Sequence, residues 1–318
     1  MTVDDFLNLD WTPPGPPLIE PPCLSPVVAD PSFLFPEETP DGKWALVAHS
    51  AWGLHLYASD DGIRWREKGL ILRHAMRPFL RRVAGEYLLF FESYAPFALP
   101  LTALPGKRPW RSAISLSRSA NLLRWSKPET LLTPSLEWMR DPILGDSISN
   151  PCLVEEATEW RLYYSASLAW IPDCGFCEPR YIGAARGVSA TGPFEPYPLP
   201  LLDPAFDVSD GVFGAGSMKV LRFDNGWIGL QNKIFSDAGG RSRSAIFALR
   251  SIDGLGWSSA AREPLMAPRP GWTSSHVYAC DARYREADGL WYLYFNARDG
   301  WRISEGRERI GRIVGRPR

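Results

Sequence analysis

The sequence lacks the features that mark several classes of protein. Its 35 basic and 36 acidic residues leave a net charge of −1, so no positive surplus indicates nucleic acid or an anionic membrane as a partner. No apolar run reaches about 18 residues, which argues against a membrane-spanning helix. The start of the chain has no basic segment followed by an apolar core, so we expect a cytoplasmic protein. These absences favour a small neutral ligand.

Cysteine is also scarce. The five cysteines are an odd number in a chain of 318 residues, and they do not suggest a disulfide framework. Cys174 and Cys177 have the CxxC spacing, yet no second pair stands at the distance that a zinc ribbon requires. A redox-active or metal-binding pair stays an alternative, but we interpret both as small residues of a loop between strands.

Helical periodicity is the third absence. No long stretch shows the i, i+3, i+4 apolar spacing of a helix, whereas 13% aromatic residues, 30 prolines and 27 glycines supply strand formers and turn formers. An all-β fold is therefore predicted. A single all-β domain of this length needs no second domain to explain it.

A repeated unit occupies most of the chain. Five times an aromatic residue opens a short apolar run that is typical of a strand, and successive anchor residues are 43, 73, 67 and 64 residues apart. This period is close to that of a four-stranded propeller blade with loops of variable length. The five anchors are Trp44, Tyr87, Trp160, Trp227 and Trp291.

Other segments recur in step with the anchors. An apolar segment precedes the anchor, and three times a polar residue and a proline introduce it, at Asp30-Pro31, Arg77-Pro78 and Asn150-Pro151. A third strand and a turn follow the anchor, with Asp-Gly pairs at 61–62 and 253–254 that suit tight turns.

These repeats predict one five-bladed β-propeller with four-stranded blades around a central channel. The proline-rich residues 1–26 are expected to form an arm on the propeller domain, 27–318, with Phe6-Leu7-Asn8-Leu9 as an outer strand that closes the ring. Because the blades of a propeller converge, the ligand site is expected at one end of the channel. The blades fall near 27–73, 74–134, 147–204, 211–268 and 272–316.

In this register the chain resembles the five-bladed β-propeller glycosidases of glycoside hydrolase families 43 and 32, over about residues 27–316. Its most specific segment is Ala29-Asp30-Pro31-Ser32, at the start of the first innermost strand. This segment looks like the one that carries the catalytic base in family 43 and the nucleophile in family 32. The resemblance thus implies that Asp30 is the general base or nucleophile. The sialidases rank lower, because they use six blades and an arginine triad that we do not find here.

A glycosidase also needs a protonated carboxyl group to release the leaving oxygen. Family 43 places a second aspartate where this chain has Asn150, and its acid at the start of the fourth blade, where residues 213–218 contain no carboxylate. An acid displaced on the same face is then expected. The candidates are Glu178, at the start of a third strand, and after it Glu92, at the end of a second strand. The alternative for each is an exposed or salt-bridged loop carboxylate.

Several other residues are expected at the same face. Arg77 opens blade two, where it suits a clamp on a carboxylate or hydroxyl, with a structural ion pair to Asp30 or Glu92 as the alternative. For His276, which opens the last innermost strand, the resemblance implies contact with a channel ion, usually calcium, although one histidine is not a metal site. No other cofactor is expected. The remaining substrate-binding candidates are Asn150, Trp52, Ser217, Lys233, Asn296 and Arg298, with Trp170 as a second stacking platform.

These expectations lead to a glycosidase-like enzyme that acts on a small sugar or glycoside, with this carbohydrate as its expected partner. Hydrolysis, phosphorolysis and transfer all remain open. Two further alternatives are a carbohydrate-binding propeller that has lost hydrolysis, in keeping with the missing carboxylate of blade four, and a propeller repurposed for a biosynthetic reaction.

Overall fold

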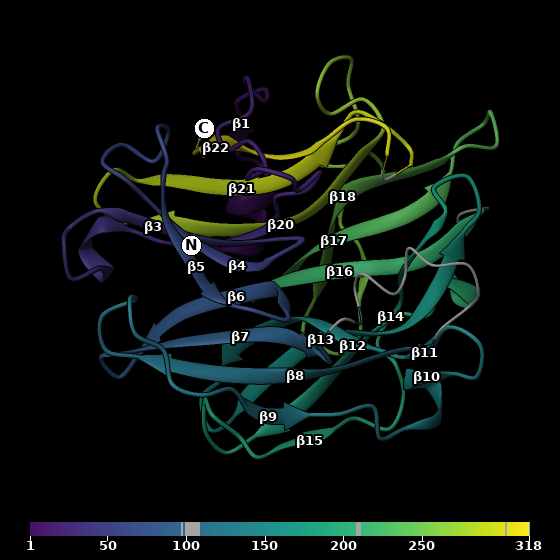
Figure 1. Ribbon diagram of the computed structural model, residues 1–318, viewed down its shortest axis with the longest axis horizontal. Coiled ribbons are helices and arrows are strands. Elements are labelled where there is room, and N and C mark those ends of the chain that lie inside the picture. The colour runs from purple at the N-terminus through teal and green to yellow at the C-terminus, as the bar shows by residue number, and fades with distance from the viewer. Residues whose placement is uncertain (97, 99–108, 208–210, 303, 318) are drawn as a thin grey trace.

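The computed structural model describes residues 1–96, 98, 109–207, 211–302 and 304–317, and β-strands dominate it (Figure 1). The predicted all-β fold is confirmed. Part of the predicted repeat 74–134 lies outside the described residues. The described helical segments are short, and none of them has the length and apolar character that crossing a bilayer requires. They include α1 (Val3–Leu7) and the 3₁₀ turns η1 (Pro36–Glu38), η2 (Glu137–Met139) and η3 (Pro204–Phe206).

The strands follow one another in antiparallel meanders, and each meander begins with its innermost strand. The first contains β2 (Ala29–Leu34), β3 (Trp44–Ser50), β4 (Gly53–Ser59) and β5 (Arg66–Leu72). The second contains β6 (Ala75–Val83), β7 (Glu86–Tyr94), β8 (Trp110–Ser119) and β9 (Glu129–Leu132), and β10 (Arg140–Asp141) and β11 (Gly145–Asp146) extend its sheet. The third contains β12 (Ile148–Glu155), β13 (Trp160–Ile171), β14 (Phe176–Gly187) and β15 (Phe194–Pro196).

The fourth and fifth meanders belong to one eight-stranded sheet, because Ser244 of β18 pairs in parallel with His276 of β20. The fourth contains β16 (Val212–Phe223), β17 (Gly226–Ser236), β18 (Ser242–Ser251) and β19 (Ser258–Ser259). The fifth contains β20 (His276–Arg285), β21 (Leu290–Arg298) and β22 (Glu308–Arg316), and β1 (Asp10–Trp11) completes it from the other end of the chain.

The prediction that Phe6-Leu7-Asn8-Leu9 forms the outer strand is wrong. Phe6 and Leu7 lie in α1, where Thr2 caps the helix and exchanges hydrogen bonds with Asp5. This capping box satisfies backbone N–H groups at the start of the helix. Phe6 also packs against aromatic rings of the fourth and fifth meanders, so both contacts stabilise the helix over a strand in this segment. Asp10–Trp11, which directly follows this segment, provides the strand that pairs with β22.

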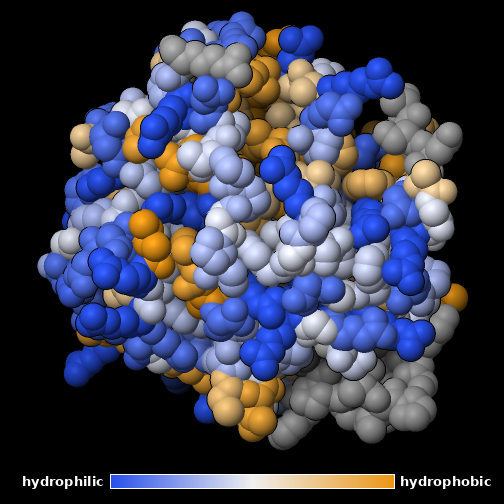
Figure 2. Space-filling view, turned by 90° about the horizontal axis from the view of Figure 1, so that it is seen from above, coloured by the Kyte–Doolittle hydropathy of each residue, from blue (hydrophilic) through white to orange (hydrophobic). Residues whose placement is uncertain are grey.

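The hydrophobic core lies between neighbouring meanders. The aromatic anchors contribute to it, and four of the five are buried, namely Trp44, Tyr87, Trp227 and Trp291. Between the first and the last meander, for example, Trp44 packs edge-on against Tyr292. On the face in Figure 2, hydrophobic residues form small groups between polar and charged ones.

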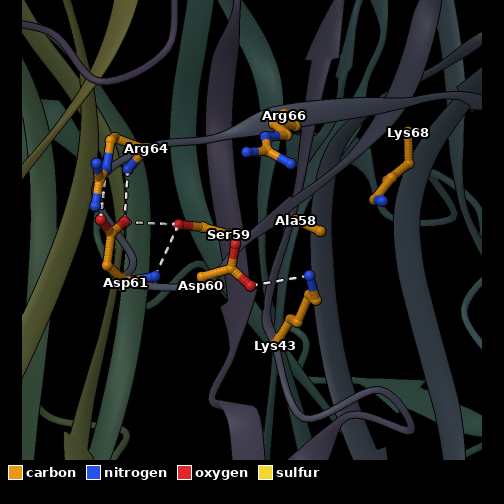
Figure 3. A pocket seen from close by; sticks show the side chains of 8 residues that line it. All are labelled: Lys43, Ala58, Ser59, Asp60, Asp61, Arg64, Arg66 and Lys68. Carbon is orange, nitrogen blue, oxygen red and sulfur yellow. Dashed lines mark hydrogen bonds and ion pairs between the residues drawn. The ribbon is translucent and has the colours of Figure 1, made fainter.

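The predicted Asp-Gly turns are built on side-chain hydrogen bonds. The hydroxyl of Ser59 accepts the N–H groups of Asp61 and Gly62, and the carboxylate of Asp61 accepts those of Ile63 and Arg64. Figure 3 shows Asp61 between Ser59 and Arg64. Gly62 has φ +67°, and a Cβ there would approach the Tyr294 hydroxyl to 2.8 Å, so glycine is required. Ser251 and Asp253 form the same turn in the fourth meander. Beside the first turn lies a charged hollow of about 210 Å³ that includes none of the predicted site residues.

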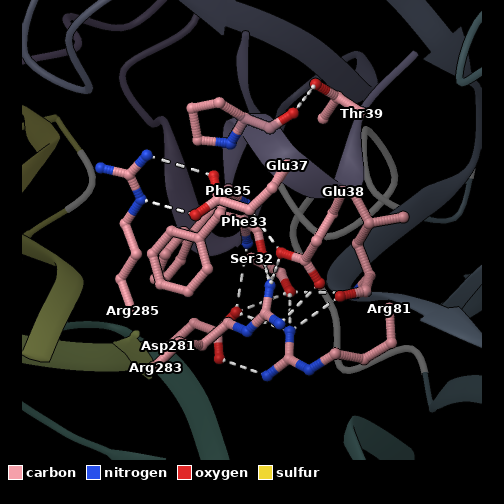
Figure 4. A network of polar contacts seen from close by, with 12 residues as sticks. Ser32, Phe33, Phe35, Glu37, Glu38, Thr39, Arg81, Asp281, Arg283 and Arg285 are labelled. Atoms are coloured by element: carbon pink, nitrogen blue, oxygen red, sulfur yellow. Dashed lines mark hydrogen bonds and ion pairs between the residues drawn. The ribbon is translucent and has the colours of Figure 1, made fainter. Parts of the chain in front are cut away.

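A buried ion pair joins the first, second and last meanders (Figure 4). The carboxylate of Asp281 on β20 receives two hydrogen bonds from the guanidinium of Arg81 on β6, at 2.7 and 2.9 Å. The same carboxylate accepts the Ser32 hydroxyl and the Phe33 N–H of β2. Burial alone would raise the pKa of Asp281, but the charge and hydrogen bonds of Arg81 outweigh burial and hold that pKa below its usual value.

We predict that Asp281→Asn lowers the free energy of unfolding by about 3–5 kcal/mol, because the partly buried Arg81 loses its carboxylate. The pKa of Asp281 is lowered by folding, so its contribution is complete above the pKa of the unfolded chain and is lost as the pH falls through the folded value. In urea unfolding, wild type and variant should therefore converge under acidic conditions.

The matched control for this experiment is Glu195→Gln, which breaks an exposed ion pair with Arg186 and should cost less than about 1 kcal/mol. An Asp281→Asn variant no less stable than this control at neutral pH would show that the ion pair does not hold the three meanders together.

Candidate active site

All five innermost strands are irregular near their first residues. The pairing with the second strand shifts at the same place in each, and the residues inside these irregularities include Asp30, Arg77, Asn150, Gly216 and Tyr278. Three of them are non-glycine residues with φ between +50° and +54°, a region that side chains rarely adopt. Such irregularities redirect side chains. Here all five residues line one cavity.

The cavity has a volume of about 980 Å³, which is enough for a small sugar. Seven predicted site residues line it, namely Asp30, Arg77, Asn150, Glu178, Ser217, Asn296 and Arg298. Trp170, the second stacking candidate, also lines it and has 47% of its surface exposed. Four other predicted residues, Glu92, Trp52, Lys233 and His276, are not part of this wall.

Asp30 is held in its ionised form. Its carboxylate lies 3.1 Å from Nδ1 of His49 on β3, and only 14% of each side chain is exposed. Burial alone would raise the pKa of Asp30, but the hydrogen bond from His49 and the positive charges of His49, Arg77 and Lys219 lower it below the ordinary value. The backbone N–H of Arg77 also approaches His49 Nδ1, at 3.5 Å. We place the proton on Nδ1, because the closer carboxylate can only accept.

Glu178, near the start of β14, has the opposite electrostatic environment. Burial raises the pKa of its carboxyl group to about 8, and the nearby charges of Glu308 and Asp30 add to this effect. The charge of Arg77 and the Tyr278 hydroxyl oppose it without cancelling it. Of these two carboxyl groups, Asp30 is therefore ionised and Glu178 protonated at neutral pH.

Glu92 lies behind Arg77 instead of at the cavity wall. Its side chain is fully buried, and its two oxygens accept hydrogen bonds from the guanidinium of Arg77, at 2.5 Å, and from the indole of Trp110, at 2.8 Å. Both oxygens are thus engaged by these two side chains. The ion pair between Arg77 and Glu92 is the structural alternative that the sequence analysis gave for Arg77. The pKa of Arg77 is raised despite burial, because Glu92, Asp30 and Glu178 favour its charge.

Two more predicted residues have other partners. Trp52 is 45% exposed and donates its indole N–H to the carbonyl of Cys23. The ammonium group of Lys233 lies 3.2 Å from the carboxylate of Asp207.

His276 is buried, and its surroundings do not fit a calcium ion. Its Nε2 lies 3.4 Å from the Ser242 hydroxyl and 3.7 Å from the thiol of Cys174. Burial, together with the charge of Arg298, lowers the pKa of His276 to about 3. Calcium requires several oxygen ligands, and no cluster of three His, Cys, Asp or Glu side chains among the described residues could hold a metal. Cys174 and Cys177 are not joined in a disulfide, and Cys177 belongs to the cavity wall.

The residues of the cavity wall that the sequence reasoning missed include Tyr278 and Glu308. Tyr278, not His276, occupies the irregularity of β20, and its buried hydroxyl lies near the carboxyl group of Glu178. Glu308 begins the third strand of its meander, and burial raises its pKa. The argument that selected Glu178, its place at the start of a third strand, also points to Glu308.

A chain of hydrogen bonds at the edge of the cavity has the connectivity of a hydrolytic triad. The Ser50 hydroxyl lies 2.8 Å from Nε2 of His55, whose Nδ1 lies 2.7 Å from the carboxylate of Glu67. Ser50, however, is only 1% exposed, and its oxygen also accepts the N–H of Trp52. A nucleophile must reach its substrate, so we assign this chain to the joining of β3, β4 and β5 rather than to catalysis.

No protein-family model and no curated protein matches the sequence. Among solved structures, the chain is similar to a glycoside hydrolase, with TM-score 0.68, 12% identity and coverage of 99% of this chain and 95% of the other. A thermostable family 43 glycoside hydrolase gives TM-score 0.63, 13% identity and coverage of 95% and 92%. An α-L-arabinofuranosidase from Podospora anserina, solved with cellotriose, gives TM-score 0.64 and 13% identity, with coverage of 96% of both chains. The resemblance to the propeller glycosidases is thus confirmed at the level of the fold.

We predict that Glu178 titrates at about pH 8 in the folded protein, which carboxyl-carbon NMR of wild type and Glu178→Gln would detect. Because folding raises this pKa, the contribution of Glu178 to stability is complete below the pKa of the unfolded chain and is lost as the pH rises through about 8. Glu178→Gln should therefore gain stability relative to wild type as the pH rises from 5 to about 9.

The exposed Glu195→Gln is the matched control, and its stability relative to wild type should stay constant over this range. A Glu178 resonance that titrates near pH 4 would refute the assignment of a protonated carboxyl group.

Proposed function

We propose that the protein is a glycosidase-like enzyme that acts on a small sugar or glycoside in the cavity. In this proposal Asp30 is the general base or nucleophile and Glu178 is the general acid. One observation carries it: two carboxyl groups of one cavity have pKa values shifted in opposite directions, downward for Asp30 and to about 8 for Glu178. Such divergence separates the base from the acid in glycoside hydrolysis.

The proposed architecture is a propeller of five four-stranded blades. Each antiparallel meander is one blade, with β1 as the outer strand of the last, on a propeller domain of residues 27–318 with an arm at 1–26. The pairing of β1 with β22 supports this reading, since it joins the two ends of the chain within one meander. The similarity in fold to propeller glycoside hydrolases also supports it.

The proposed reaction uses the two carboxyl groups together. Asp30, ionised and oriented by His49, accepts the proton of a water molecule that attacks the anomeric carbon, or attacks that carbon itself. Glu178 donates its proton to the leaving oxygen. By analogy with family 43 the first route, with inversion, is favoured, an argument from fold alone. Asn150 and Ser217 suit contacts with sugar hydroxyls, and Trp170 suits stacking on a sugar ring.

A carbohydrate-binding protein without hydrolysis is the second candidate. The observation that favours it is that Asn150 and Gly216 stand at the third and fourth irregularities, the two places where the resemblance to family 43 implies a carboxylate. Its signature would be a wild type that hydrolyses no member of a broad panel of aryl glycosides yet binds a sugar, with binding weakened by Arg77→Met or Asn150→Ala.

If Asp30 is the base, Asp30→Asn should lower kcat by about 10²–10⁴-fold on any glycoside that the protein hydrolyses. Asparagine keeps the shape and the hydrogen bonding but removes the proton acceptor. Release of reducing sugar measures turnover, and urea unfolding checks that the variant is folded. Asp60→Asn, at the exposed ion pair with Lys43, is the matched control and should keep full turnover. A loss of only a few-fold, or a loss of folding, would make Asp30 a structural residue.

If Glu178 is the acid, Glu178→Gln should abolish hydrolysis of glycosides with poor leaving groups and spare activated aryl glycosides, which need no proton. The alkaline limb of the wild-type pH profile, expected near pH 8, should disappear in this variant. Glu92→Gln is the comparison: it acts through Arg77, so its effect should be equal for both kinds of leaving group. Full activity of both variants on unactivated glycosides would place the acid elsewhere.

A further inference from the structure

Asn296 on β21 links two elements of the cavity through its side-chain amide. Its carbonyl oxygen accepts the backbone N–H of Asp30, at 3.0 Å, and its amide nitrogen donates to the carboxyl oxygen of Glu308 on β22. An amide can satisfy both neighbours in only one orientation, since an N–H must face an acceptor on one side and an oxygen must face a donor on the other. One N–H and one oxygen lone pair of this amide, which the sequence assigned to sugar binding, are therefore engaged with the protein itself.

The N–H that Asn296 accepts belongs to a residue with an unfavourable backbone. Asp30 has φ +52°, a conformation that costs of order 1–3 kcal/mol and persists only where its surroundings impose it. This conformation directs the carboxylate of Asp30 toward His49 and the cavity. The hydrogen bond from Asp30 N–H to Asn296 is thus one of the contacts that hold the carboxylate in place.

Glu308 is placed to fix Asn296 and the start of β2 together. Its backbone N–H donates to the carbonyl of Pro26, and its backbone carbonyl accepts the N–H of Val28, both at 3.0 Å. These bonds flank the segment that leads into Asp30. Only 8% of Glu308 is exposed, so removing its carboxyl group would leave the amide nitrogen of Asn296 buried without an acceptor.

We propose that Glu308 is a positioning residue for Asp30 and acts through the side-chain amide of Asn296. The inference rests on the proposed function in one respect, the role of Asp30 as base. Glu308 is required as a hydrogen-bond acceptor rather than as a charge or a proton donor. It follows that glutamine, whose carbonyl oxygen can accept the same N–H, replaces Glu308, whereas leucine of similar size does not.

The experiment compares Glu308→Gln, Glu308→Leu and Asn296→Leu by two readouts. The first is hydrogen exchange of the Asp30 backbone amide, followed by NMR on the full chain without substrate. It should stay slow in wild type and in Glu308→Gln, and become at least tenfold faster in both leucine variants. The second is turnover, where both leucine variants should lose about 10²-fold in kcat, with KM changed far less, because the base is misplaced. Glu308→Gln should keep most of kcat.

Glu20→Gln and Glu20→Leu are the matched pair of controls, since Glu20 binds Arg309, the neighbour of Glu308 on β22, from outside the cavity. Both should behave as wild type. The proposal would be overturned if Glu308→Gln and Glu308→Leu lost kcat equally and only on glycosides with poor leaving groups, because Glu308 would then be a proton donor. Unchanged exchange of the Asp30 amide in Glu308→Leu would also overturn it. If exchange responds as expected but wild type hydrolyses no glycoside, the proposed function fails and the positioning of Asp30 stands.

Discussion

The carboxylate of Asp281 is the point on which the arrangement of the cavity depends. It binds Arg81 of β6 and both Ser32 and Phe33 of β2 from its place on β20, so it sets three innermost strands relative to one another. Asp30, Arg77 and Tyr278 lie two to four residues before these contacts on the same three strands. A displacement at the ion pair would therefore be transmitted through a short rigid strand to the cavity. Stability and site geometry share one set of contacts.

The cavity separates its carboxyl groups by surroundings rather than by residue type. Each of them is at least partly buried, and burial alone would raise every pKa. The pKa of Asp30 is nevertheless lowered, because His49 supplies a hydrogen bond and His49, Arg77 and Lys219 supply positive charge. At Glu178 the charge of Arg77 opposes burial without cancelling it, and the negative charges of Glu308 and Asp30 add to the effect of burial, so the pKa of Glu178 rises to about 8. Arg77 in turn depends on Glu92, whose role is to hold the guanidinium and not to face a ligand.

The sequence predicted part of the cavity wall, for identifiable reasons. Asp30, Arg77 and Asn150 were found because a proline follows each of them at the start of an innermost strand, a local signal that repeats. The fifth innermost strand has Ala279 in place of this proline, so His276 was chosen and Tyr278, two residues later, was missed. Glu92 and Lys233 were selected as ends of second strands. The partners that occupy them, Arg77 with Trp110 and Asp207, come from distant segments that no local pattern encodes.

The sequence by itself determined the all-β fold, the repeating unit and the turns, because strand alternation, proline and the Ser-x-Asp-Gly hydrogen bonds act over a few residues. Only the tertiary structure decided which carboxyl group is ionised and which is protonated, because a pKa depends on burial and on charges brought together from different meanders. It also decided that Asn296 serves Asp30 and Glu308. Residues 30, 296 and 308 meet only when the first meander lies beside the last, a contact that separation along the chain does not reveal.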